Sequence, residues 1–145
     1  MAQAVVIDTN VFVGALLGPG GANRQIIRLC LEGRLDPVMG AALFAEYEDV
    51  LARQDLFATC EVDAQERDEL FDAFLNACRW VSIYFLWRPN LRDEADNHLV
   101  ELAVAAGAPA IVTNNVADFV GEQMAFLNIR AVRPGDLIVE MERRP

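Results

Sequence analysis

The chain has 145 residues, 54% of them hydrophobic, which suits a single domain over residues 1–145 with its own apolar core and favours an oligomer. Its 22 acidic residues outnumber the 12 basic ones, and the net charge of −10 argues against passive nucleic-acid binding through a cationic surface. No apolar run reaches the roughly 20 residues of a membrane span and no signal peptide is visible, so we expect a cytoplasmic protein without a membrane anchor.

Apolar runs typical of strands alternate with segments of helical period. The expected strands lie at Val5–Ile7, around Pro37–Met39, and at Val81–Phe85, Ala110–Val112 and Ile129–Val132. The expected helices span Val11–Leu17, Asn23–Glu32, Ala41–Arg53, Ala64–Ala77 and Asp93–Ala106. This alternation predicts an α/β fold with a mostly parallel sheet between layers of helices. The pair Pro134-Gly135 is expected only to punctuate the tail.

Asp8 is the first candidate site residue because it follows the first expected strand directly. Open α/β folds bind their ligands at the carboxyl edge of the sheet, where such a residue lies. Asp118 follows the fourth expected strand through a turn that begins at Thr113. It would come near Asp8 if the two strands are neighbours.

Two further acids are expected to face inward from helices. At 100° per residue, Glu46 falls on the apolar face of its helix, whereas Glu48 points to solvent. Asp96 falls on the apolar stripe of the helix that follows, with Asp93 one turn earlier. An acid on such a stripe needs a partner.

Several carboxylates in one pocket repel one another, and a divalent cation would relieve that repulsion. Oxygen ligands suit Mg²⁺ or Mn²⁺, and the sequence has no His or Cys constellation for zinc. Such a site favours metal-assisted phosphodiester hydrolysis. Four polar side chains could hold the carboxylates in place: Thr9, Asn10, Thr113 and Asn115.

Other enzyme classes fit the composition poorly. All basic residues are arginines, which excludes a P-loop lysine and Schiff-base chemistry. The single histidine, His98, has no serine or cysteine partner in a nucleophile motif and is expected to be an ordinary residue on a helix face.

Each acid also has an ordinary structural interpretation. Asp8 could cap the first helix, Glu46 could pair with Arg53, Asp96 could complement a helix dipole, and Asp118 could belong to a turn. Two groups of arginines are similarly ambiguous, since they could form basic patches or ordinary solvated helix charges: Arg24, Arg28 and Arg34, and Arg88 and Arg92.

Four ordered segments resemble the PIN-domain family, and within it the bacterial VapC-like toxins of toxin–antitoxin pairs. They are Val5–Val13 (VVIDTNVFV), Glu46–Leu51 (EYEDVL), Asp93–Leu99 (DEADNHL) and Ala110–Phe119 (AIVTNNVADF). The resemblance implies a Rossmann-like α/β/α sandwich and an endoribonuclease that depends on Mg²⁺ or Mn²⁺. Asp8, Glu46 and Asp96 match the first three acidic positions of the family, and Asp118 is the fourth.

The resemblance also implies partners: an RNA substrate, a homodimer, and an antitoxin whose peptide binds an apolar groove beside the active site. The apolar first helix could supply that groove, or it could be plain core. Many relatives carry an acid two residues after the threonine, where this chain has Asn115. This departure keeps open a catalytically weak or inactive module that binds RNA or protein. A metal-dependent phosphatase or DNA nuclease with the same acids is a third hypothesis.

Overall fold

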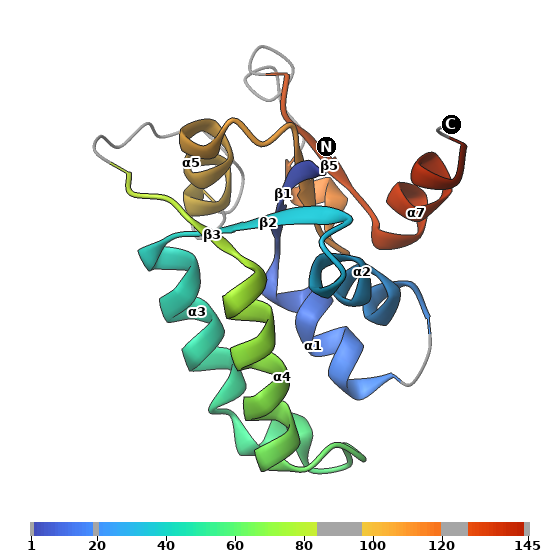
Figure 1. Ribbon diagram of the computed structural model, residues 1–145. Helices are drawn as coiled ribbons and strands as arrows, with labels where there is room; N and C mark the ends of the chain where they lie inside the picture. Colours follow the sequence, from blue (N-terminus) through green and yellow to red (C-terminus); the bar gives the residue numbers. More distant parts are fainter. Residues whose placement is uncertain (1, 19–20, 84–96, 120–127, 144–145) are drawn as a thin grey trace.

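Five strands form the central sheet of the computed structural model, which describes residues 2–18, 21–83, 97–119 and 128–143 (Figure 1). The strands are β1 (Gln3–Ile7), β2 (Leu35–Met39), β3 (Arg79–Trp80), β4 (Ala110–Val112) and β5 (Arg130–Val132). The α-helices are α1 (Thr9–Leu17), α2 (Ala22–Leu31), α3 (Ala41–Leu51), α4 (Ala64–Ala77), α5 (Asn97–Ala106) and α7 (Pro134–Arg143). Short 3₁₀ helices follow α3 and β4, at η1 (Gln54–Phe57) and η3 (Val116–Phe119).

The strand order is β3-β2-β1-β4-β5, and every pair of neighbours in this order runs parallel. The prediction of a parallel α/β sheet is therefore confirmed. From β1 the chain first adds β2 on one side and later crosses to β4 on the other. The carboxyl ends of β1 and β4 thus flank the point where the order reverses, which is where open sheets of this kind bind ligands.

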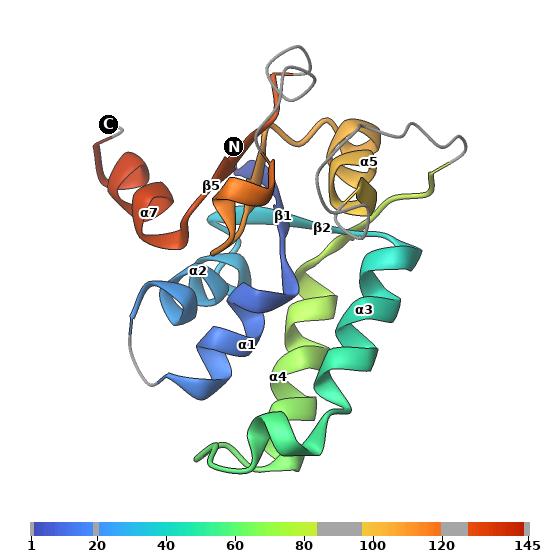
Figure 2. The same cartoon turned by 180° about the vertical axis from the view of Figure 1, so that it is seen from behind.

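Helices cover both faces of the sheet, as the α/β/α prediction requires. Helix α5 packs against β1, β2 and β4, while α2 and α4 pack against β2. The two views show α5 on one side of the strands and α1 and α2 on the other (Figures 1 and 2). Strands β1 and β4 are the buried centre, with Val5, Val6 and Ile111 fully inaccessible. Within the described ranges no helix is long and apolar enough to cross a membrane.

Most of the apolar first helix belongs to the core. Val11, Phe12 and Leu16 of α1 are buried. The Phe12 ring centroid lies 5.7 Å from that of Tyr47 and 5.3 Å from that of Phe74. Aromatic contacts at such distances add to the stabilisation from burial alone. They fix α1 against α3 and α4, so most of this helix is core as the alternative has it, while Leu17 at its end is exposed and a docking role for that end stays a prediction.

The third strand was predicted too late in the chain. The structure places it at Arg79–Trp80, whereas residues 81–83 of the predicted Val81–Phe85 form no strand and residues 84–85 lie outside the described ranges. The reason is the length of the neighbouring strand. Strand β2 ends at Met39, whose carbonyl oxygen accepts the last ladder hydrogen bond from the backbone N–H of Val81 at 2.9 Å. Strand propensity without a partner strand forms no ladder.

The C-terminal segment forms a helix that the sequence interpretation missed. Pro134 is the first residue of α7, a position that favours proline because its missing N–H would be unpaired there anyway. Asp136 in the first turn and Arg143 in the last complement the helix dipole. Helix α7 packs beside α2, and both ribbon views show the two helices adjacent.

Candidate active site

Asp8 lies at the carboxyl edge of the sheet, between the ends of β1 and β4. Ile7 pairs with Val112, and the backbone N–H of Asp8 donates to the Val112 carbonyl oxygen at 3.0 Å. Thr113, the residue after β4, is therefore a neighbour of Asp8 even though the two are 105 positions apart. The expected adjacency of these two strand ends is confirmed.

The Asp8 carboxylate is buried, with only 5% of the residue exposed, and it accepts hydrogen bonds from side chains across the strand ends. Thr113 Oγ1 donates to Asp8 Oδ2 at 2.9 Å, and Asn10 Nδ2 donates to the same oxygen at 3.2 Å. Asp8 is the residue before α1, yet its side chain makes no capping hydrogen bond. The capping interpretation is therefore wrong, and the carboxylate points toward β4.

Glu46 reaches the same edge from α3. Thr9 Oγ1 donates to Glu46 Oε1 at 3.0 Å and lies 3.5 Å from Asp8 Oδ1, so one hydroxyl stands between the two carboxylates. The next residue, Tyr47, is fully buried, and its hydroxyl donates to the Ile7 carbonyl oxygen at 2.8 Å. This bond ties α3 to the end of β1. The buried face of α3 centres on Leu43 and Tyr47, with Glu46 at its border and half-buried.

His98 is a member of this site that the sequence interpretation missed. Its Nε2 lies 2.6 Å from Glu46 Oε2, whereas Arg53, the partner considered for Glu46, pairs with Asp49 at 2.9 Å. Nδ1 of His98 is buried and has no hydrogen-bond partner within the described ranges. The residue was expected to be an ordinary position on a helix face. The one sequence feature that could have pointed to His98 is its position two residues after Asp96.

A chain of asparagines extends the site toward α2. Asn10 Oδ1 accepts from the backbone N–H of Asn114 at 3.1 Å, and Asn114 Nδ2 donates to Asn23 Oδ1 at 3.0 Å. Gly14 leaves the room that Asn23 occupies, because a Cβ at position 14 would collide with the Asn23 amide. Asn114 and Asn23 were not among the predicted site residues. Nothing local in the sequence marks a pair 91 positions apart.

The two acids differ in how their surroundings affect ionisation. Burial raises the pKa of Asp8 above its usual value, the hydrogen bond from Thr113 opposes that rise, and the nearby charge of Glu46 adds to it. The hydrogen bond with His98 lowers the pKa of Glu46, against the smaller opposing effect of burial. Glu46 is thus stabilised as an anion by groups of the chain itself, whereas the charge on Asp8 is not fully compensated.

The other predicted site residues have weaker structural links to Asp8 and Glu46. Asp118 is half-buried in η3 and forms no hydrogen bond or ion pair with the acids above, so its role stays a prediction. Asn115 meets the described part of the site through its backbone N–H, which donates to Thr113 Oγ1 at 3.0 Å. Asp93 and Asp96 lie outside the described residues. In the part of the chain that the structure describes, no three His, Cys, Asp or Glu side chains form a metal-binding group.

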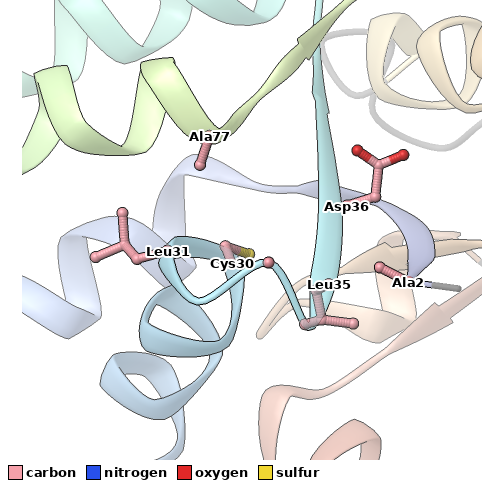
Figure 3. Close-up of a pocket in the computed structure, with 7 residues that line it drawn as sticks. Ala2, Cys30, Leu31, Leu35, Asp36 and Ala77 are labelled. Carbon is pink, nitrogen blue, oxygen red and sulfur yellow. The ribbon is translucent and has the colours of Figure 1, made fainter.

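A cavity of about 440 Å³ opens at the opposite, amino edge of the sheet. Figure 3 shows residues from α2, β2 and the end of α4 around it, including Cys30, Asp36 and Ala77. Burial raises the pKa of the Cys30 thiol well above its usual range and that of Cys78 to about 12. Protonated thiols are poor nucleophiles, so this cavity offers no comparable chemistry.

Comparisons with known proteins agree with this geometry. A family profile described as PIN domain matches residues 4–117. The fold is similar to that of a chain from the crystal structure of VapBC2 from Rickettsia felis bound to a DNA fragment from their promoter, with a TM-score of 0.54 and 14% identity over 90% of this chain and 98% of that one. It is also similar to PAE2754 from Pyrobaculum aerophilum, with a TM-score of 0.57 and 11% identity over 99% and 91% of the two chains. No curated protein matches the sequence.

Proposed function

Because the chain belongs to the PIN-domain family, we propose that it is a metal-dependent endoribonuclease that hydrolyses RNA phosphodiester bonds. One observation carries the proposal. Two carboxylates, Asp8 and Glu46, share the hydroxyl of Thr9 at the switch point of a parallel sheet, and among the described residues neither caps a helix nor pairs with an arginine. Such a pair, in such a place, is typical of a catalytic or ligand-binding site.

The donor set fits Mg²⁺ or Mn²⁺. Asp8 and Glu46 offer only oxygen ligands, and a cation bound beside Asp8 would favour the charged form that burial disfavours. We propose that Asp96 and Asp118 complete the set. Asp96 precedes α5 by one residue and His98 by two, and His98 already contacts Glu46. A divalent cation held there would lower the pKa of bound water and compensate charge on the scissile phosphate.

The remaining residues of the site orient these carboxylates. Thr113 and Asn10 direct one oxygen of Asp8, which leaves the other oxygen facing Thr9 and Glu46. His98 and Thr9 each engage a different oxygen of Glu46. Hydrogen bonds of this kind fix the direction of a carboxylate ligand and increase its affinity for a cation.

The physiological setting that we propose is that of a toxin restrained by an antitoxin. Its support is the family membership together with the likeness in fold to a chain of VapBC2. Because that likeness comes at 14% identity, the support concerns the scaffold and not the target RNA.

A second candidate is a module that binds RNA without cleaving it. The side chain of Asn115 is exposed, and the residue stands where many relatives carry an acid. Within the described ranges only Asp8 and Glu46 lie close together among the predicted acids. A site that lacks a further ligand would bind a cation weakly. Such a protein would lose cleavage but could still bind RNA.

Cleavage of a mixed-sequence single-stranded RNA in Mg²⁺, Mn²⁺ and EDTA tests the proposal. Asp8→Asn and Glu46→Gln should lower the rate more than about 100-fold, the upper range for residues that only orient a ligand. Glu48→Gln is the matched control, because Glu48 lies on the same helix and is exposed. Cleavage should require metal and survive in the control.

Two results would contradict the nuclease proposal. Equal cleavage by Asp8→Asn, with a cooperative melt that shows the variant to be folded, would remove Asp8 from the chemistry. No cleavage by the wild type in any metal, together with intact RNA binding, would favour the binding module. Competition with single-stranded DNA and a phosphomonoester separates the ribonuclease from a DNA nuclease or a phosphatase.

A further inference from the structure

Three arginines border one shallow depression on α2. The depression has a volume of about 330 Å³ and is lined by Gly21, Arg24, Gln25, Arg28, Leu29, Glu32 and Arg34. Arg24 and Arg28 are four positions apart on the helix and so lie on the same side, about 6 Å apart at their Cβ atoms. Arg34 follows Gly33, whose φ of 76° turns the chain from α2 toward β2. Together these three residues line the depression from α2 to the start of β2, and we call them the arginine row.

The arginine row differs in its partners from three other arginines of the described ranges. Arg53, Arg79 and Arg130 each form an ion pair, with Asp49, Asp36 and Glu140. Within the described ranges no member of the arginine row forms one, although the chain has 22 acidic residues.

Three cations against the single carboxylate of Glu32 make this depression positive on a protein of net charge −10. Like charges left unpaired in one place repel one another, and a polyanionic ligand relieves that repulsion.

The arginine row begins beside the candidate active site. Arg24 follows Asn23, which accepts from Asn114, and Asn114 in turn donates to Asn10, a partner of Asp8. Arg133 adds an exposed cation at the same place, since its Nη1 donates to the Asn114 carbonyl oxygen at 3.3 Å. We therefore expect a polymer lying along α2 to come close to the carboxylates at the Arg24 end of the arginine row.

We propose that the arginine row binds the backbone phosphates of a single-stranded RNA whose next phosphates lie at Asp8 and Glu46, an inference that rests on the proposed nuclease function. Guanidinium groups suit this task because their planar fork can donate two hydrogen bonds to one phosphate. RNA fits better than an acidic peptide because the arginine row leads to acids placed for phosphodiester chemistry. The positive depression also explains how a strongly acidic protein attracts a polyanion.

Binding of a labelled oligouridine to the full chain in EDTA, measured by fluorescence anisotropy over a series of KCl concentrations, tests the inference without cleavage. Arg28→Gln with Arg34→Gln is the first variant, because both side chains are exposed and the fold should be unaffected. At about 0.1 M salt, affinity should fall about fivefold for each phosphate that the variant no longer neutralises. The slope of log K against log salt should become shallower by about 0.7 for each such phosphate.

Arg24→Gln is added in a second variant, since Arg24 Nε donates to the Ala15 carbonyl oxygen at 3.0 Å and its removal could affect folding. A circular-dichroism melt accompanies each variant. Arg53→Gln with Arg79→Gln is the matched control for the first variant, because it also removes two positive charges, at ion pairs outside the arginine row. It should bind oligouridine like the wild type.

The outcomes separate this inference from the nuclease proposal. Loss of oligouridine binding by the arginine variants supports the arginine row even if the wild type cleaves no RNA in any metal. Metal-dependent cleavage with unchanged binding by the arginine variants overturns the arginine row and leaves the nuclease intact. Failure of the wild-type protein to bind oligouridine would also overturn the arginine row. So would arginine variants that lose binding of polyglutamate but keep binding of oligouridine.

Discussion

At the carboxyl edge of the sheet the buried carboxylate of Asp8 accepts hydrogen bonds from several side chains. At the amino edge, among the described residues, the thiols of Cys30 (Figure 3) and Cys78 have no comparable partners. Burial raises the pKa of the acid and of both thiols. The thiols are neutral in their ordinary state, so burial leaves them inert. The acid is an anion in its ordinary state, so its burial has to be supported by Thr113 and Asn10. A buried ionisable group thus indicates a functional site only where neighbouring side chains hold its charged form in a fixed direction.

Apart from replacing the carboxylates themselves, the largest effect should come from removing the donors that orient Asp8. Thr113 is fully buried, and its hydroxyl donates to Asp8 while accepting from Asn10 Nδ2 and from the backbone N–H of Asn115. Thr113→Val keeps the shape but leaves these groups unpaired. We expect a loss of about 10- to 100-fold in metal affinity and cleavage rate, and of about 1–3 kcal/mol in the free energy of unfolding. Isothermal titration with Mn²⁺ and urea unfolding measure the two.

Thr113→Ser retains the hydroxyl and is the control for this change. Its metal affinity should stay close to that of the wild type. If Thr113→Val binds Mn²⁺ as well as Thr113→Ser does, the hydroxyl is only a packing feature, and the contrast between the two edges loses its functional meaning.

A smaller effect is expected on the pH dependence of stability. Because the pKa of folded Asp8 is raised above its value of 3.8 in the unfolded chain, the folded state binds the proton more tightly. The contribution of Asp8 to the stability of the metal-free protein should therefore fall as pH rises from about 3.8 through the raised pKa, whereas that of Glu46, whose pKa is lowered, has the opposite sign.

Asp8→Asn removes the loss of stability that the buried charge causes. The amide oxygen of the new side chain can still accept the hydrogen bond from Thr113. At pH 7 in EDTA the variant should melt higher than the wild type, by about 4 °C for each kcal/mol of destabilisation removed. The difference should shrink as the pH approaches 3.8. Thermal melts between these pH values measure it. A variant that melts below the wild type at neutral pH would mean that the charge on Asp8 is compensated without metal.

The same contrast explains what could be predicted from sequence. The position of Asp8 follows from local signals, since an apolar run ends abruptly and the chain must leave a buried strand there. Strand β4 and Thr113 follow from the same pattern. What surrounds these residues does not, because His98 and Glu46 are 52 positions apart, and Asn114 and Asn23 are 91 apart. Such contacts depend on how α3, α5 and α2 pack.

The errors in the elements have the same origin. Residues Val81–Phe85 have more strand propensity than Arg79–Trp80, but β2 offers no carbonyl beyond Met39 to extend the pairing. The turn-forming pair Pro134-Gly135 also favours the first turn of a helix, and contact with α2 selects the helix. In both cases a neighbouring element decided between two local possibilities.

The smallest effect on stability should come from removing the ion pair at the amino edge of the sheet. Arg79 Nε donates to Asp36 Oδ2 at 3.1 Å, and the two side chains are 48% and 32% exposed. Exposed pairs of this kind contribute about 0–1 kcal/mol because water and salt screen them. Arg79→Gln should therefore lower the urea midpoint only slightly, and less at high salt, with cleavage and oligouridine binding unchanged. A larger loss of stability, or any loss of cleavage, would mean that the two edges are coupled through β2 and that the amino edge helps to position Asp8.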